Sequence, residues 1–120
     1  MSFVQIVTFE TDDITPFESL EHEWLAATEG RRTLVDGALY RDRTDPRRYV
    51  SINHFASYEE AMVNSALPET DAFAQQAMRL STGPAVFTDL ERVSGFDVRD
   101  HRAAQLRAYL ETNTAPEGTG

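Results

Sequence analysis

Residues 3–10 (FVQIVTFE) constrain the fold more than any other stretch of the chain, because they predict a strand with apolar side chains on both faces. Successive side chains of a strand point to opposite faces, so one face holds Phe3, Val7 and Phe9 together with Gln5, and the other holds Val4 and Ile6. A strand that is apolar on both faces is covered on both faces. We therefore expect a layer on each side of it.

The remaining segments predict an α+β domain. We expect a helix over residues 16–29, with Thr15 as its cap, and strands over residues 33–41 and 48–55. Ser57 begins a second helix that ends at Pro68, and Thr70 caps a third. A fourth strand covers residues 85–93. This order, β-α-β-β-α-α-β, is typical of the ferredoxin-like plan with its second helix broken.

Right-handed crossovers place all these helices on one face of a four-stranded antiparallel sheet and leave the other face bare. The first strand nevertheless needs a cover on its second face. A two-fold partner that packs sheet against sheet supplies that cover, so we predict a homodimer that forms a dimeric α/β barrel. This domain takes residues 1–96, a helical extension takes 97–111, and a flexible tail takes 112–120.

Composition excludes several functions. A net charge of −9 argues against nucleic-acid binding, and no run reaches the roughly 18 apolar residues of a membrane span. The absence of cysteine excludes disulfides, thiolate chemistry and cysteine-based metal sites, and suits the cytoplasm. Three scattered histidines make no metal-binding motif, so we expect no metal.

Three polar residues fall on an otherwise apolar sheet face. Gln5, Ser51 and Asn53 have the same parity on the first and third strands, which this fold places side by side. Such a set needs hydrogen-bond partners, and a few polar groups within apolar walls are what a ligand pocket requires. A hydrogen-bonded ladder at the dimer seam is the equally weighted alternative.

Two ionisable residues are candidate bases. His54 points opposite to Asn53 and could deprotonate a phenol near neutral pH, although a hydrogen-bonded core or interface histidine is the commoner role. Glu21 falls within the apolar stripe of the first helix, between Phe17 and Trp24. A carboxylate among aromatic rings could act as a base; the alternative is a position at the edge of the stripe, in contact with water or Arg31.

The helices supply four further candidates. Asn64 precedes the break at Pro68, where it binds a ligand or satisfies backbone groups at the helix end. Arg79 holds an oxyanion or complements the helix dipole. Trp24 and Phe73 serve either as walls of a ligand pocket or as core.

Residues 3–93 resemble the dimeric α/β-barrel proteins of the antibiotic biosynthesis monooxygenase family. The resemblance lies in FVQIVTFE, EWLAATEGRRT, RYVSINHFASYEEAM and NSALPETDAF. It implies a pocket between sheet and helices in which some members oxidise polycyclic phenols without a cofactor, using Asn, Trp, Tyr, His and Arg. The residues of four of these types are Trp24, Asn53, His54, Asn64 and Arg79. The same scaffold also carries isomerases, dechlorinating and haem proteins, and binding modules.

The predicted function is therefore cofactor-independent oxygenation of an aromatic, polyketide-like phenol. His54 or Glu21 would take the phenolic proton, and Gln5, Asn53 or Arg79 would hold the oxyanion. The sequence has no nucleotide-binding loop or metal-ligand spacing, so we expect no cofactor, with haem left open. The alternative is a non-catalytic small-molecule-binding module, or an isomerisation or cyclisation on the same scaffold.

Overall fold

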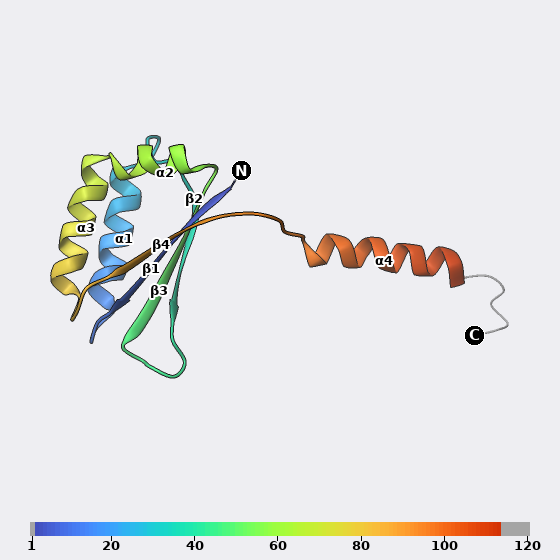
Figure 1. Cartoon of the computed structure of the whole chain (residues 1–120), viewed down its shortest axis with the longest axis horizontal. Coiled ribbons are helices and arrows are strands. Elements are labelled where there is room, and N and C mark those ends of the chain that lie inside the picture. Colours follow the sequence, from blue (N-terminus) through green and yellow to red (C-terminus); the bar gives the residue numbers. More distant parts are fainter. Residues whose placement is uncertain (1, 114–120) are drawn as a thin grey trace.

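The structure, a computed structural model, describes residues 2–113 except for the side chains of 100–104 and 113. The strands are β1 (Phe3–Glu10), β2 (Leu34–Arg41), β3 (Arg48–Phe55) and β4 (Val86–Glu91), and the helices are α1 (Thr15–Ala27), α2 (Tyr58–Ser65), α3 (Pro68–Leu80) and α4 (Val98–Asn113) (Figure 1). The strands form one sheet in the order β2-β3-β1-β4, with every neighbouring pair antiparallel. The predicted ferredoxin-like α+β fold is confirmed.

Two aromatic clusters join the helices to one face of the sheet. In the first cluster, Phe3 and Phe55 pack against Ala61 of α2. In the second, Phe9 stacks on Phe17 of α1 with a ring-centroid distance of 4.7 Å. Phe3 and Phe9 have the same parity on β1, so α1 and α2 cover the same face, which we call the helix-side face.

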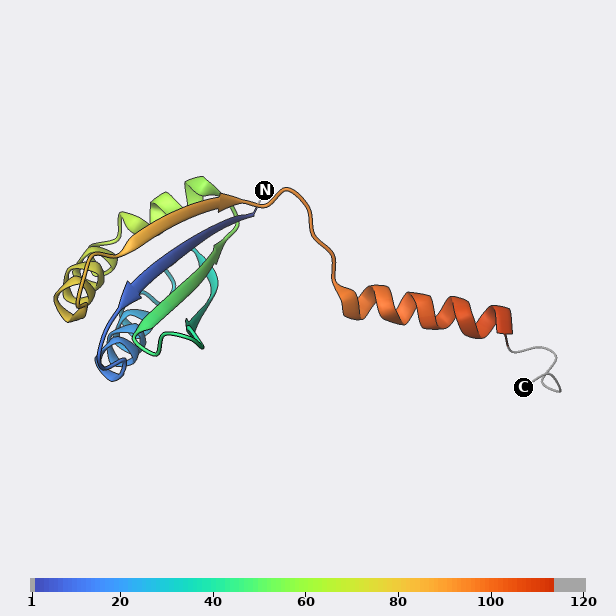
Figure 2. The same ribbon diagram turned by 60° about the horizontal axis from the view of Figure 1, so that its bottom comes forward.

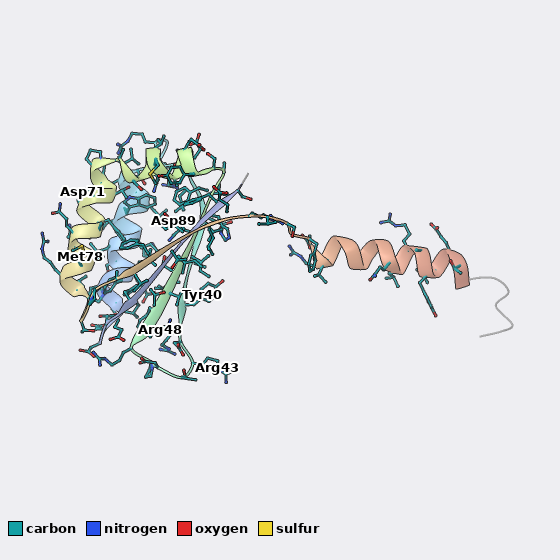
Figure 3. All side chains as sticks on the ribbon, in the orientation of Figure 1. Tyr40, Arg43, Arg48, Asp71, Met78 and Asp89 are labelled. Atoms are coloured by element: carbon teal, nitrogen blue, oxygen red, sulfur yellow. The ribbon has the colours of Figure 1, made fainter. Side chains whose placement is uncertain are left out.

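The opposite face of the sheet, which we call the open face, is largely apolar. In residues 2–113 no helix lies over it (Figures 1 and 2). Its apolar side chains are Val4, Ile6, Ala38, Tyr40, Val50, Ile52, Val86 and Leu90. Tyr40 is 55% exposed and Val86 is 59% exposed, and Tyr40 lies on the side of the sheet away from α1 and α3 (Figure 3). The second apolar face predicted from residues 3–10 is therefore present, and residues 2–113 leave it uncovered.

The helix ends differ from prediction in two places. Ser57 caps α2 as predicted, because its side chain accepts the N–H of Glu60. Thr15 is not a cap, since it is the first residue of α1 and its own N–H donates to the carboxylate of Asp13. Thr70 is not a cap either: Pro68 begins α3, which places Thr70 inside the helix.

The last helix extends away from the rest of the molecule. A linker follows β4 and leads to α4, and the described chain reaches 68 Å along its longest axis (Figures 1 and 2). Of the predicted tail over 112–120, residues 114–120 lie outside the described residues. Within the described chain, no helix combines the length and the apolar character needed to cross a membrane.

Candidate functional site

A row of polar residues crosses the helix-side face at one register level. Gln5 of β1 pairs with Asn53 of β3 on one side and with Asp89 of β4 on the other, and Asn53 pairs with Gly37 of β2. We call these four residues the polar row. On β1 its level lies between Phe3 and Phe9, which anchor the two aromatic clusters, so polar groups occupy the middle of an apolar layer.

Hydrogen bonds connect the row across three strands. Gln5 Nε2 donates to Asp89 Oδ1 over 3.3 Å. Asn53 Nδ2 donates to Ser51 Oγ over 3.1 Å and to the backbone oxygen of Gln5 over 3.4 Å. The prediction that Gln5, Ser51 and Asn53 lie together is confirmed. The bond from Gln5 to Asp89 and the bond from Asn53 to the Gln5 backbone are longer than the usual range of about 2.7–3.2 Å for N–H···O hydrogen bonds.

Gly37 makes room for the Asn53 amide. A Cβ atom at this position would lie 3.0 Å from Asn53 Oδ1 and 3.7 Å from the backbone oxygen of Ile52. The atom that comes closest to Gly37 therefore belongs to a side chain of the row.

The row offers both a donor and an acceptor to a ligand. Gln5 uses one amide N–H on Asp89 and keeps a second, and Asp89 keeps a second carboxylate oxygen. Gln5, Ser51 and Asn53 are half-buried, while Asp89 is exposed on the edge strand (Figure 3). A hydroxyl group placed beside Gln5 and Asp89 could therefore donate to one residue and accept from the other.

Hydrogen bonds between α1 and α3 hold the helix layer together. Trp24 Nε1 donates to Thr70 Oγ1 over 2.9 Å, and Arg31, just after α1, binds both carboxylate oxygens of Glu69 over 2.6 and 3.1 Å. The hydrogen bond from Arg31 lowers the pKa of Glu69. Trp24 and Phe73 are both half-buried in this layer, so each has surface left for a ligand.

Asn64 and Arg79 lie outside the row. Asn64 is only 6% exposed, and its Oδ1 accepts the backbone N–H of Thr33 over 3.3 Å. It therefore joins the end of α2 to the start of β2. Arg79 is exposed in the last turn of α3, a position that suits the helix dipole.

The two predicted bases also lie away from the row. Glu21 is exposed on α1, and no hydrogen bond joins it to the row within the described residues. His54 points opposite to Asn53, as predicted, and therefore to the open face, where its Nδ1 lies 2.5 Å from Asp36 Oδ1. Because His54 and Asn53 are neighbours on one strand, they point to opposite faces of the sheet, and His54 cannot reach a ligand on the helix side.

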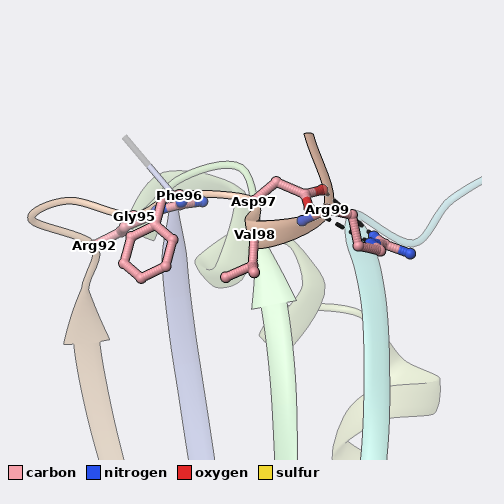
Figure 4. A pocket seen from close by; sticks show the side chains of 6 residues that line it. All are labelled: Arg92, Gly95, Phe96, Asp97, Val98 and Arg99. Carbon is pink, nitrogen blue, oxygen red and sulfur yellow. Dashed lines mark hydrogen bonds and ion pairs between the residues drawn. The ribbon is translucent and has the colours of Figure 1, made fainter. Parts of the chain in front are cut away.

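A hollow of about 560 Å³ lies beside His54 at the end of the open face where β1 begins. We call it the His54 hollow; its walls are formed by Ser2, Val4, Val35, Asp36, His54, Phe55, Ala56, Leu90, Glu91 and Arg92. A second hollow, of about 640 Å³, lies along the linker to α4 and is lined by Arg92, Gly95, Phe96, Asp97, Val98 and Arg99 (Figure 4). Its lining residues are all exposed, so it is an open groove rather than a shaped site.

Sequence reasoning missed Asp89 and Asp36. Asp89 lies in the predicted fourth strand, two residues after Phe87 and on the same face. The strand order of this fold places that strand beside the first, so parity alone could have paired Asp89 with Gln5. The pairing of Asp36 with His54 follows a bulge between Leu34 and Asp36, and no sequence signal gives its position. Among the described residues, no group of three or more His, Asp or Glu could hold a metal ion.

Solved structures share this arrangement of strands and helices. An asparagine-to-alanine variant of SnoaB, a cofactor-independent oxygenase from Streptomyces nogalater, matches 79% of this chain and 96% of its own, with 19% identity and a TM-score of 0.67. Rv0793 from Mycobacterium tuberculosis matches 81% of this chain and all of its own, with 16% identity and a TM-score of 0.67. A structure described as an antibiotic biosynthesis monooxygenase matches 78% of this chain and all of its own, with 15% identity and a TM-score of 0.62.

This chain has the fold of the antibiotic biosynthesis monooxygenases. The resemblance stated from the sequence is confirmed at the level of the fold. No family model and no curated protein matches the sequence. These matches cover about four fifths of the chain.

Proposed function

We propose that this chain is a cofactor-independent monooxygenase that binds a phenolic, polyketide-like aromatic compound at the polar row. The observation that carries the proposal is the Gln5–Asp89 pair, which presents a donor and an acceptor side by side between two aromatic clusters. Trp24 and Phe73, half-buried in the helix layer, supply aromatic surface for the ligand. The fold shared with SnoaB, a cofactor-independent oxygenase, supports the reaction class.

The proposed reaction starts with loss of the phenolic proton. The O–H bond breaks, the proton passes to the Asp89 carboxylate, and the second N–H of Gln5 donates to the phenolate. The substrate's carbanion form then reduces O₂. In an anthrone, this O–H belongs to the enol tautomer, so its loss places the carbanion on the former methylene carbon. O₂ adds to that carbon, one oxygen atom stays as the new carbonyl, and the other leaves as water with the carbon's remaining hydrogen and the proton returned by Asp89. Asn53 holds the backbone of β1 beside Gln5 and so positions the donor.

We also propose a homodimer that buries the open face. The exposed apolar side chains of this face, among them Tyr40, Val86 and Leu90, support a sheet-on-sheet arrangement. A cytoplasmic location stays a prediction from composition.

A non-catalytic binding module is the second candidate. The observation that favours it is the placement of His54 and Glu21 away from the row, which leaves Asp89 as the ionisable group within it. A binding module would need only the hydrogen-bonding groups and the aromatic walls.

Oxygen uptake distinguishes these two functions. Metal-free protein is mixed with 1,8-dihydroxyanthrone, and O₂ consumption is compared with the uncatalysed rate. We expect acceleration by the wild type and a loss of about a hundredfold in kcat/KM for Asp89→Asn, with Glu21→Gln as the matched carboxylate control. Binding without oxygen-dependent acceleration identifies the module. Full turnover in Asp89→Asn contradicts the assigned base.

A further inference from the structure

Phe87 is an exposed aromatic residue beside the polar row. The strands place four phenylalanines on the helix-side face, and three of them, Phe3, Phe9 and Phe55, are at most 8% exposed. Phe87 of β4 is 61% exposed. The phenylalanine that the helices leave uncovered is therefore the one nearest to Asp89 in the chain.

The register of the sheet places Phe87 and Asp89 on the same face. Phe87 pairs with Val7 of β1, and Asp89 pairs with Gln5. Residues two apart on a strand are separated by about 7 Å along it, so the ring of Phe87 and the Gln5–Asp89 pair are neighbours on the helix-side face. Thr88, between them, points to the open face. A sheet-on-sheet dimer therefore buries the face that Phe87 does not occupy.

The helix layer covers only the start of β4. Ala85, two residues before Phe87 and on the same face, packs together with Ala77 of α3 against the second aromatic cluster. Ala85 is half-buried, whereas Phe87 and Asp89 are both exposed. The aromatic ring and the carboxylate are therefore presented together on the helix-side face, where the cover from α3 has ended.

We propose that Phe87 selects fused-ring phenols over single-ring phenols at the polar row; this inference rests on the proposed function. The hydroxyl of the ligand lies between Gln5 and Asp89, and the ring fused to the phenol lies against the ring of Phe87. Offset-stacked and edge-to-face aromatic pairs add affinity beyond the area that they bury. A single-ring phenol makes the hydrogen bonds but does not span the distance of about 7 Å to Phe87.

Binding of phenol and 2-naphthol tests this role, because the two ligands share the hydroxyl and differ by one fused ring. The shift of the Gln5 side-chain amide signal in ¹⁵N spectra measures both dissociation constants. Phe87→Ala should weaken 2-naphthol about tenfold and should change phenol binding by less than about twofold. Phe87→Tyr keeps the ring and should bind 2-naphthol as the wild type does. Phe96→Ala, which removes a phenylalanine that is 82% exposed in the linker, is the matched control and should change neither ligand.

The Asp89→Ala variant separates this inference from the proposed function, because both ligands share the hydroxyl that Asp89 accepts. It should weaken phenol and 2-naphthol by the same factor. Equal weakening of both ligands by Phe87→Ala, unchanged 2-naphthol binding in that variant, or loss of 2-naphthol binding in Phe87→Tyr would overturn the role of Phe87 alone. Unchanged binding of both ligands to Asp89→Ala would instead overturn the polar row as the binding site, and with it the selection made there.

Discussion

Substitution of Gly37 by alanine should report directly on the packing of the polar row. Gly37 does not have a positive φ angle, so the backbone itself accepts alanine. In a strand interior, replacing glycine by alanine stabilises a protein by about 0.5–1 kcal/mol. The new Cβ would lie 3.0 Å from Asn53 Oδ1, a few tenths of an ångström too close, so the amide must move.

The free energy lost by overpacking exceeds the free energy gained by replacing glycine with alanine only when Asn53 is present. Overpacking costs about 1–3 kcal/mol, and displacement of the amide also weakens its hydrogen bonds to Ser51 Oγ and the Gln5 backbone. We expect Gly37→Ala to destabilise the wild type by about 1 kcal/mol and to stabilise the Asn53→Ala variant by about 0.5 kcal/mol. The coupling between the two positions is then about 1.5 kcal/mol.

Urea unfolding followed by the fluorescence of Trp24 measures all four proteins of this cycle. Gly83→Ala is the control, because a Cβ there meets no atom within 4 Å. Equal effects of Gly37→Ala in both backgrounds, within about 0.5 kcal/mol, would refute the contact between Gly37 and the amide.

Three further perturbations test other parts of the structure. Trp24→Phe removes the hydrogen-bond donor to Thr70, and urea denaturation should show a free energy of unfolding about 1 kcal/mol lower. Adding Thr70→Val to this variant should lower the free energy of unfolding no further. The backbone N–H and hydroxyl of Thr44 lower the pKa of Asp42 to about 2. The Asp42 carboxylate therefore stabilises the fold above about pH 4, and this stabilisation is lost as the pH falls through about 2. Acid unfolding of Asp42→Asn should lack this part of the pH dependence. Tyr40→Asp places a charge on the open face and should shift sedimentation from dimer to monomer, whereas a wild type that sediments as a monomer contradicts the dimer.

The strands were predictable because their pattern is local and strong. The alternation in residues 3–10 gives the bounds of β1 and both of its faces, and the same parity argument places Ser51 and Asn53 beside Gln5. Helix starts were harder to predict. Thr15 is not the cap, because α1 already includes it, and its own N–H donates to the carboxylate of Asp13 two residues earlier.

The candidate site was only partly predictable, because a site depends on register between distant strands. Asp89 enters the row through the pairing of the first strand with the last, 84 residues later in the chain. The Asp36–His54 contact depends on a bulge that shifts β2 by one position. Trp24 was correctly placed on the apolar stripe of its helix, but its hydrogen bond to Thr70 depends on how α1 and α3 pack, which no local pattern gives.

A crystal structure of the protein with 1,8-dihydroxyanthrone, prepared without oxygen so that the ligand is not consumed, tests binding at the polar row most directly. We expect the fused rings to lie between the helix layer and the sheet, with one ligand oxygen within hydrogen-bond distance of both Gln5 Nε2 and an Asp89 carboxylate oxygen. A ligand bound only on the open face, or a polar row whose hydrogen bonds are unchanged at saturating ligand, would contradict this expectation.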